Sequence, residues 1–149
     1  MKHTISKSGI FQALVFTVVL FFTLDVSAQI NYEHFIRAGR MDLQKEDYIS
    51  AVKNFNTAIY SRSDGFEAYF LRGIAKFSLG DFQGAKNDFT KTISMHPLYV
   101  RAYHYRGISL DRMYDFPHAI SDFDKAVKQI ESKKPATTAD SSHVQKGNK

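Results

Sequence analysis

The chain of 149 residues contains no cysteine and no tryptophan. Without cysteine it forms no disulfide bond and no thiolate metal site, and no lipid is attached to an N-terminal cysteine. This absence does not identify a compartment, because exported proteins need not use disulfides. Phe and Tyr supply the aromatic share of 14%. Large rings that recur at helical spacing would bury much of the surface of so small a protein.

Sequence signatures of catalysis are also missing. The chain has no glycine-rich phosphate loop and no nucleophile elbow, and no two of its six histidines stand four residues apart as a helical metal pair would. These histidines are His3, His34, His96, His104, His118 and His143. We therefore expect no catalytic residues, no metal site and no cofactor, and we expect that the protein is not an enzyme.

The net charge of +5 is concentrated on the two ends of the chain. Lys2 and Lys7 lie near the N-terminus, and four lysines lie between residues 133 and 149. A nucleic-acid-binding protein instead concentrates positive charge on a folded face. The charge pattern therefore predicts no nucleic-acid partner.

Residues 1–28 have the pattern of a secretory signal peptide. Two lysines precede an apolar run over residues 10–24, and Val-Ser-Ala ending at Ala28 provides a cleavage site. The alternative is an uncleaved membrane anchor formed by residues 10–24, although a full span takes about 20 apolar residues. We expect export, to a bacterial periplasm or the medium, with a mature chain that begins at Gln29.

The body of the chain repeats at a period of 34 residues from Tyr32 onward, without a gap. Six columns of like residues fall in register, which indicates a repeat architecture. The columns are Gly39, Gly73 and Gly107; Ala51, Ala85 and Ala119; Phe35, Tyr69 and Tyr103; Tyr48, Phe82 and Phe116; Phe55, Phe89 and Phe123; and Asp47, Asp81 and Asp115.

The columns describe a pair of helices in each repeat. Glycine inside a helix costs about 1 kcal/mol relative to alanine, so the glycine column indicates that a second helix approaches closely. We expect the alanine of the next column to lie opposite it. In the second helix the pattern Ala-x-x-x-Phe, as in Ala85 and Phe89, puts both side chains on one face.

Capping residues give the helix boundaries. Gly80 and Asp81 fit a helix end followed by a helix start, and Pro117 fits a first helical turn. Pro97 lies past the end of another helix. The expected helices span 31–45, 48–61, 66–79, 82–95, 100–113 and 116–131. The predicted fold class is all-α, an α-solenoid of about six antiparallel helices.

The pattern resembles the tetratricopeptide repeat (TPR) family, whose glycine and Ala-x-x-x-Phe pair are present in all three repeats. The resemblance covers residues 32–133, as repeats 32–65, 66–99 and 100–133. It implies a superhelix whose first helices line a concave groove that binds a protein or peptide partner. Where the family has leucine before the glycine, this chain has Ala38, Arg72 and Arg106.

The resemblance also implies which first-helix residues contact a partner. The candidates are Ile36, Arg37, Arg40, Phe70, Ile74, Phe77, Arg101, His104, Tyr105, Ile108 and Arg112. The apolar members, such as Phe70, Ile74 and Phe77, could instead be core against a neighbouring repeat. An apolar centre with basic ends suits a peptide with apolar anchors and an acidic end. Of the family's chaperone-clamp residues only Arg101 has a counterpart here, so we do not expect a chaperone clamp.

Two charge pairs also follow the period. Arg72 precedes Asp88, and Arg106 precedes Asp122, by the same interval. Repeat one lacks both members. We hypothesise that each arginine pairs with its aspartate between the two helices of a repeat; the alternative is that all four are separate solvated charges.

The third repeat runs directly into residues 134–149, a polar stretch that we expect to be disordered. Repeat arrays usually end in a capping unit with a polar outer face. The face of repeat three that a fourth repeat would cover is therefore expected to be open, for weak self-association or for docking of a partner. The alternative functions to an interaction module are accordingly a structural protein that self-assembles through this face and, if residues 10–24 are retained, a membrane-anchored assembly factor.

Overall fold

The computed structural model describes residues 7–133, and all of its regular structure in that range is helical. The helices are α1 Lys7–Gln44, α2 Tyr48–Ser61, α3 Phe66–Ser78, α4 Phe82–Met95, α5 Val100–Arg112 and α6 Phe116–Lys133. Together they confirm the all-α solenoid. The predicted bounds of α2 to α6 agree closely with the structure.

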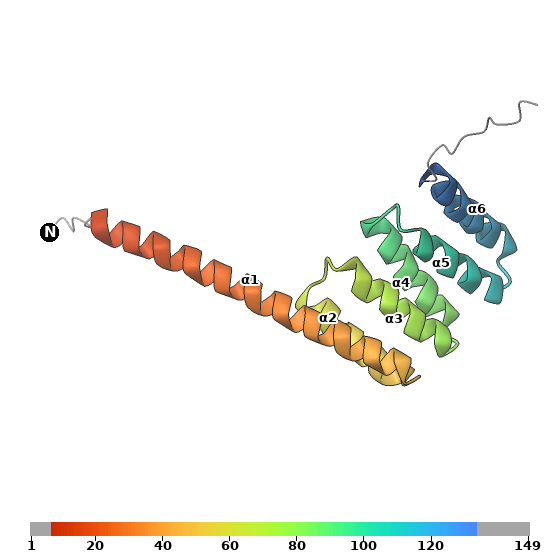
Figure 1. Cartoon of the computed structure of the whole chain (residues 1–149), viewed down its shortest axis with the longest axis horizontal. Coiled ribbons are helices and arrows are strands. Elements are labelled where there is room, and N and C mark those ends of the chain that lie inside the picture. The colour runs from red at the N-terminus through yellow and green to blue at the C-terminus, as the bar shows by residue number, and fades with distance from the viewer. Residues whose placement is uncertain (1–6, 134–149) are drawn as a thin grey trace, which may run out of the picture.

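Each helix packs antiparallel against the next one in the chain, so that α1 pairs with α2, α3 with α4, and α5 with α6 (Figure 1). The backbones of the first helices also approach one another, α1 with α3 and α3 with α5. Within residues 7–133 the second helices make no such approach. The row of first helices is therefore the inner, concave side of the array.

Each helix pair is held at its glycine by a phenylalanine ring. A Cβ atom added to Gly39, Gly73 or Gly107 would lie 2.5, 2.7 or 2.6 Å from the Phe55, Phe89 or Phe123 ring of the second helix. Real Cβ atoms do not approach so closely, so the column must remain glycine. The sequence predicted the close approach, but the nearest group is the ring rather than the alanine expected there.

The turn inside each repeat has one geometry three times. Glu46, Gly80 and Tyr114 all take positive φ, at 59°, 81° and 62°. In each case the next residue donates its backbone N–H to a carbonyl near the end of the first helix, as Asp81 does to Lys76 at 2.9 Å. This is a left-handed C-cap, and only the second repeat has the residue that adopts it without strain.

The aspartate after each left-handed residue begins the second helix. The Asp47 carboxylate accepts a hydrogen bond from the Ser50 N–H at 3.1 Å, and Asp81 accepts one from the Gly84 N–H at 2.8 Å. The bonds to Ser50 hold the pKa of the Asp47 carboxyl below its usual range. Asp115 is different, because its carboxylate lies 2.7 Å from the His118 ring, which lowers its pKa.

Helix α1 is longer than the sequence predicted. The predicted helix spans 31–45, whereas the structure begins it at Lys7, and its first half projects from the array (Figure 1). Residues 10–38 contain neither glycine nor proline, so nothing ends the helix there. No helix within residues 7–133 is long and apolar enough to cross a membrane.

Two further predictions are not tested by the structure. The cleavage site at Ala28 remains a prediction, and the tail 134–149, which we expect to be disordered, lies outside the described residues.

Candidate partner-binding surfaces

The predicted groove residues divide by exposure. Five polar or charged members are exposed: Arg37, Arg40, Arg101, His104 and Arg112. Four are half-buried: Ile74, Phe77, Tyr105 and Ile108. Ile74 and Phe77 of α3 and Ile108 of α5 are half-buried on helices of the inner row, and their contact with a partner stays a prediction.

Two predicted groove residues, Ile36 and Phe70, are instead core. Ile36 packs among Tyr32, Phe55 and Ala68, and both candidates are 2% exposed. The Phe70 ring lies against the Phe89 ring, and the rings of Tyr99, just before α5, and of Tyr105 in α5 cover it. The reason is that the next repeat's first helix packs over this column. A partner cannot reach either side chain in the folded array.

Interactions within the array already use some of the groove charges. Arg40 of α1 forms an ion pair with Glu67 of α3, which links the first two repeats. The Arg101 guanidinium lies 5.0 Å from the centre of the Phe70 ring. Arg112 lies 6.0 Å from the centre of the Phe82 ring. Such contacts orient a guanidinium and leave its positive charge available to an acidic ligand.

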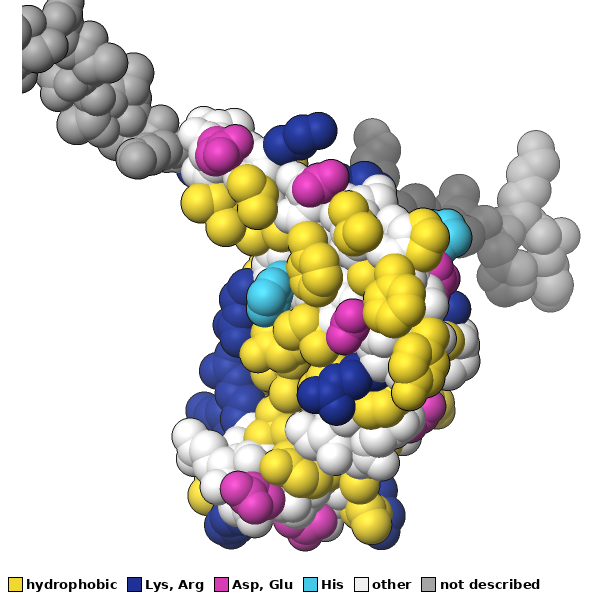
Figure 2. Space-filling model, turned by 90° about the vertical axis from the view of Figure 1, so that its right-hand side faces the viewer, with side chains coloured by type: hydrophobic (Ala, Val, Ile, Leu, Met, Phe, Trp, Pro, Cys, Tyr) yellow, Lys and Arg dark blue, Asp and Glu magenta, His cyan; other side chains and the backbone are white. Residues whose placement is uncertain are grey.

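A second surface lies on repeat three, the last repeat among the described residues 7–133. We call it the end face: a cavity of about 400 Å³ between α5 and α6, lined by Val100, Arg101, His104, Tyr105, Phe123, Ala126, Val127 and Ile130. Figure 2 views the molecule from this end and shows hydrophobic side chains gathered on it. Three predicted groove residues therefore line the end face: Arg101, His104 and Tyr105.

No protein-family model matches this chain, and no curated protein matches it. Solved structures do. MamA superposes with a TM-score of 0.67 at 25% identity, over 68% of this chain and 60% of the MamA chain. The Arabidopsis OM64 TPR domain gives 0.69 at 24%, over 72% and 88%. The TPR2B domain of yeast Sti1 gives 0.68 at 24%, over 70% and 83%.

The chain has the fold of a TPR solenoid. It spans less than two thirds of the MamA chain and most of the two isolated TPR domains. The likeness confirms the repeat architecture predicted from the glycine and phenylalanine columns. The likeness concerns the fold, so which ligand this chain binds has to be argued from its own surface residues.

The predicted charge pairs are present in this TPR array. Arg72 donates from Nε and Nη2 to the Asp88 carboxylate at 2.9 and 2.6 Å. Arg106 does the same to Asp122 at 2.6 and 2.7 Å. Both aspartates are buried, at 4% and 3% exposure. The alternative of separate solvated charges is wrong, because a buried carboxylate needs this fork of donors.

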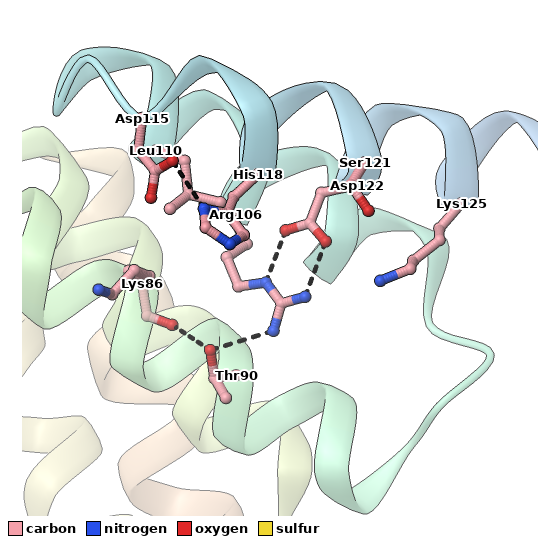
Figure 3. Close-up of a pocket in the computed structure, with 9 residues that line it drawn as sticks. All are labelled: Lys86, Thr90, Arg106, Leu110, Asp115, His118, Ser121, Asp122 and Lys125. Carbon is pink, nitrogen blue, oxygen red and sulfur yellow. Dashed lines mark hydrogen bonds and ion pairs between the residues drawn. The ribbon is translucent and has the colours of Figure 1, made fainter.

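Each of these arginines also reaches the preceding repeat. Arg72 Nη1 donates to Asn56 Oδ1 at 2.7 Å, and Arg106 Nη1 donates to Thr90 Oγ1 at 3.1 Å. Figure 3 shows Arg106 between Asp122 of α6 and Thr90 of α4. The sequence missed this bond between repeats, although Asn56 and Thr90 are themselves one period apart. The TPR pairs are thus stacked by polar as well as apolar contacts.

A polar pocket of about 330 Å³ surrounds the Arg106 fork, on the side of the second helices (Figure 3). Lys86 and Lys125 border it, together with the paired Asp115 and His118. Its aspartates already have partners, so it has little capacity for a strong ligand. Within residues 7–133 no cluster of three or more His, Asp or Glu side chains could hold a metal ion.

Proposed function

We propose that this protein is an exported protein–protein interaction module, a scaffold or adaptor that binds a peptide or protein through the concave groove. The observation that carries the proposal is the pairing of an apolar floor with exposed cations on one row of helices. Ile74, Phe77 and Ile108 form the floor, and Arg37 and Arg112 stand at its two ends. Such a surface suits an extended or helical segment with apolar anchors and a carboxylate.

The similar structures support the class of function. The TPR2B domain of yeast Sti1 was solved as a complex with pHsp70. We do not propose the same ligand here. Ile36 is buried under the second repeat, and the clamp columns offer only Arg101 as an exposed cation. The proposed partner is an acidic segment that meets arginine side chains and an apolar floor.

Export is proposed from residues 1–28 alone. The intact mass of the protein purified from its native source tests it. A mature chain that starts at Gln29 supports export with cleavage. A chain that retains residues 10–24 in a membrane fraction would instead support the uncleaved anchor, and with it a second candidate function, a membrane-anchored assembly factor.

Affinity capture with matched variants tests the groove. Arg37→Glu combined with Arg112→Glu reverses charge on the inner row, whereas Lys53→Glu combined with Lys128→Glu reverses two exposed charges on the second helices. We expect a protein recovered by the wild-type chain to be lost with the first double variant and kept with the second. Equal recovery by both variants would reject the groove as the binding surface.

A further inference from the structure

We propose that the end face docks one helix of another protein, and that this helix carries a small residue, an arginine four residues later and a second small residue three residues after that. The proposal concerns a different surface from the concave groove. Two observations support it. The equivalent surfaces of repeats one and two are covered by α3 and α5, and only the end face carries a carboxylate, Asp124, at the position that bonds the covering helix.

The end face consists of the columns that are buried in repeat one. Val100, His104, Phe123 and Ala126 lie 68 residues after Tyr32, Ile36, Phe55 and Ala58. In repeat one these four residues are at most 2% exposed, because α3 covers them. On the end face, by contrast, His104 is exposed, Val100 and Phe123 are half-buried, and of the four only Ala126 is buried. Beside them, Val127 is 50% exposed and Ile130 59%. The end face therefore has the residues that pack against a helix elsewhere in the array, but no described helix covers it.

The covering helices inside the array share one pattern. Ala68 and Ala75 of α3 are both fully buried against the preceding repeat, and Ala102 and Ser109 of α5 take the same places. Small side chains at positions i and i+7 lie on one side of a helix and let its backbone approach closely. A helix that covers the end face needs the same two small residues.

The arginine at position i+4 supplies the polar contact. Arg72 and Arg106 each donate a hydrogen bond to a second-helix residue of the preceding repeat, Asn56 or Thr90. The same column in repeat three is Asp124, which is exposed and has no ion-pair partner within residues 31–133. A carboxylate there replaces a neutral acceptor, so an arriving arginine would form a charge-assisted bond. This charge identifies the occupant as a helix that carries arginine.

Within residues 31–133, a second copy of this chain does not supply such a helix at its free end. The corresponding positions of α1 are His34, Ala38 and Met41, of which His34 and Met41 are bulky and exposed where the array requires small residues. Helices α3 and α5 have the right pattern, but their small residues are already buried inside the array. The described helices of a second copy are thus excluded, and we assign the occupant to a different protein.

The test uses the full chain and a peptide of residues 65–79, the α3 sequence. A lactam between Tyr69→Glu and Gly73→Lys holds the peptide helical, on the side that faces α4 in the array. We expect saturable binding by fluorescence anisotropy. The control peptide, with Ala68→His and Ala75→Met, carries the bulky residues of α1 and should bind at least tenfold more weakly.

Receptor variants locate the site. Ile130→Lys should abolish binding, whereas Ile120→Lys should not, because Ile120 is equally exposed on α6 but does not line the cavity. Asp124→Ala and the peptide change Arg72→Ala should each weaken binding about tenfold, the size expected for a charged hydrogen bond. Combined, they should weaken it no further, since they remove the same contact.

Three results would overturn the proposal: a peptide that is helical by circular dichroism and does not bind, binding that survives Ile130→Lys, or additive effects of Asp124→Ala and Arg72→Ala. A fourth would be a wild-type dimer in sedimentation that Ile130→Lys dissociates, because it would assign the end face to a second copy. None of these results bears on the groove, whose test uses Arg37 and Arg112.

Discussion

The two ends of the array present the same columns, but a neighbouring repeat covers them at one end only. At the first end Tyr32 is buried under Gly65 and under the Arg62 guanidinium, which lies 3.5 Å from the centre of its ring. Burial raises the pKa of the Tyr32 phenol above 10.0. At the other end, Val100 lines an open cavity. The difference comes from the neighbouring repeat and not from the repeat itself, as expected for a solenoid.

Repeat one also differs from the other two between its helices. Repeats two and three have a buried aspartate held by an arginine, and in repeat two Lys76 adds a contact to Asp88 at 2.9 Å. Repeat one has a neutral donor instead, as Asn54 donates to Asp42 at 2.6 Å. Asp42 and Asn54 occupy the same columns as Lys76 and Asp88. The carboxylate is therefore on the first helix in repeat one and on the second helix in repeat two.

The largest loss of stability is expected from removing the buried carboxylate of repeat two, and it tests the difference between repeats one and two. Asp88→Ala leaves Arg72 and Lys76 without their buried carboxylate, and should lower the free energy of unfolding by about 3 kcal/mol. Asn54→Ala in repeat one should cost only about 1 kcal/mol, the net value of a hydrogen bond. Urea unfolding of both variants gives the two numbers. Equal losses would mean that the ionic and neutral contacts stabilise the helix pairs alike.

Substitutions in the glycine column should have the next largest effect on stability. They also test whether the last repeat is packed less tightly than the middle one. Gly73→Ala drives a methyl group into the Phe89 ring and should cost about 1–3 kcal/mol. Gly107→Ala should cost less, because the Phe123 ring borders the open cavity and can shift into it. Thermal unfolding of the two variants decides the order. A larger loss at Gly107 would contradict the open end.

A glycine substitution in a left-handed turn should increase the stability of the protein. Tyr114→Gly should stabilise the chain by about 1 kcal/mol, because glycine adopts a φ of 62° without the strain of a Cβ. Gly80→Ala, in the same turn of repeat two, should lose a similar amount. A loss from Tyr114→Gly would show that the tyrosine side chain contributes more than its backbone strain costs. Denaturant midpoints with unchanged slopes measure both effects.

The smallest effect concerns pH and the start of α2. The folded pKa of Asp47 lies below its usual value of 3.8, so the charged carboxylate stabilises the helix. That contribution is complete above pH 3.8 and disappears as the pH falls through the folded value. Asp47→Asn should thus lower the melting temperature slightly near neutrality. The variant and wild type should converge in acid, and a difference that grows in acid would contradict this assignment.

Local signals in the sequence predicted most of the fold. The glycine, alanine and aspartate columns placed five helices, and the spacing of Arg72 and Asp88 predicted their ion pair, because each feature lies within one repeat. The errors arose where a distant segment decides the outcome. Ile36 and Phe70 are buried by the next repeat, and His104 in the same column is exposed because no helix of the described residues covers it. The start of α1 was missed because an apolar run can be both a targeting signal and a helix.

Hydrogen exchange resolved by helix tests most directly whether stability in this array depends on neighbouring repeats. Helices covered on both sides should open only with the whole array, while the end pair should open at lower cost. We expect the slowest amide exchange in α3 and α4, and faster exchange in α5 and α6 around Phe123 and Val127. Equal or slower exchange in α6 than in α4 would contradict it.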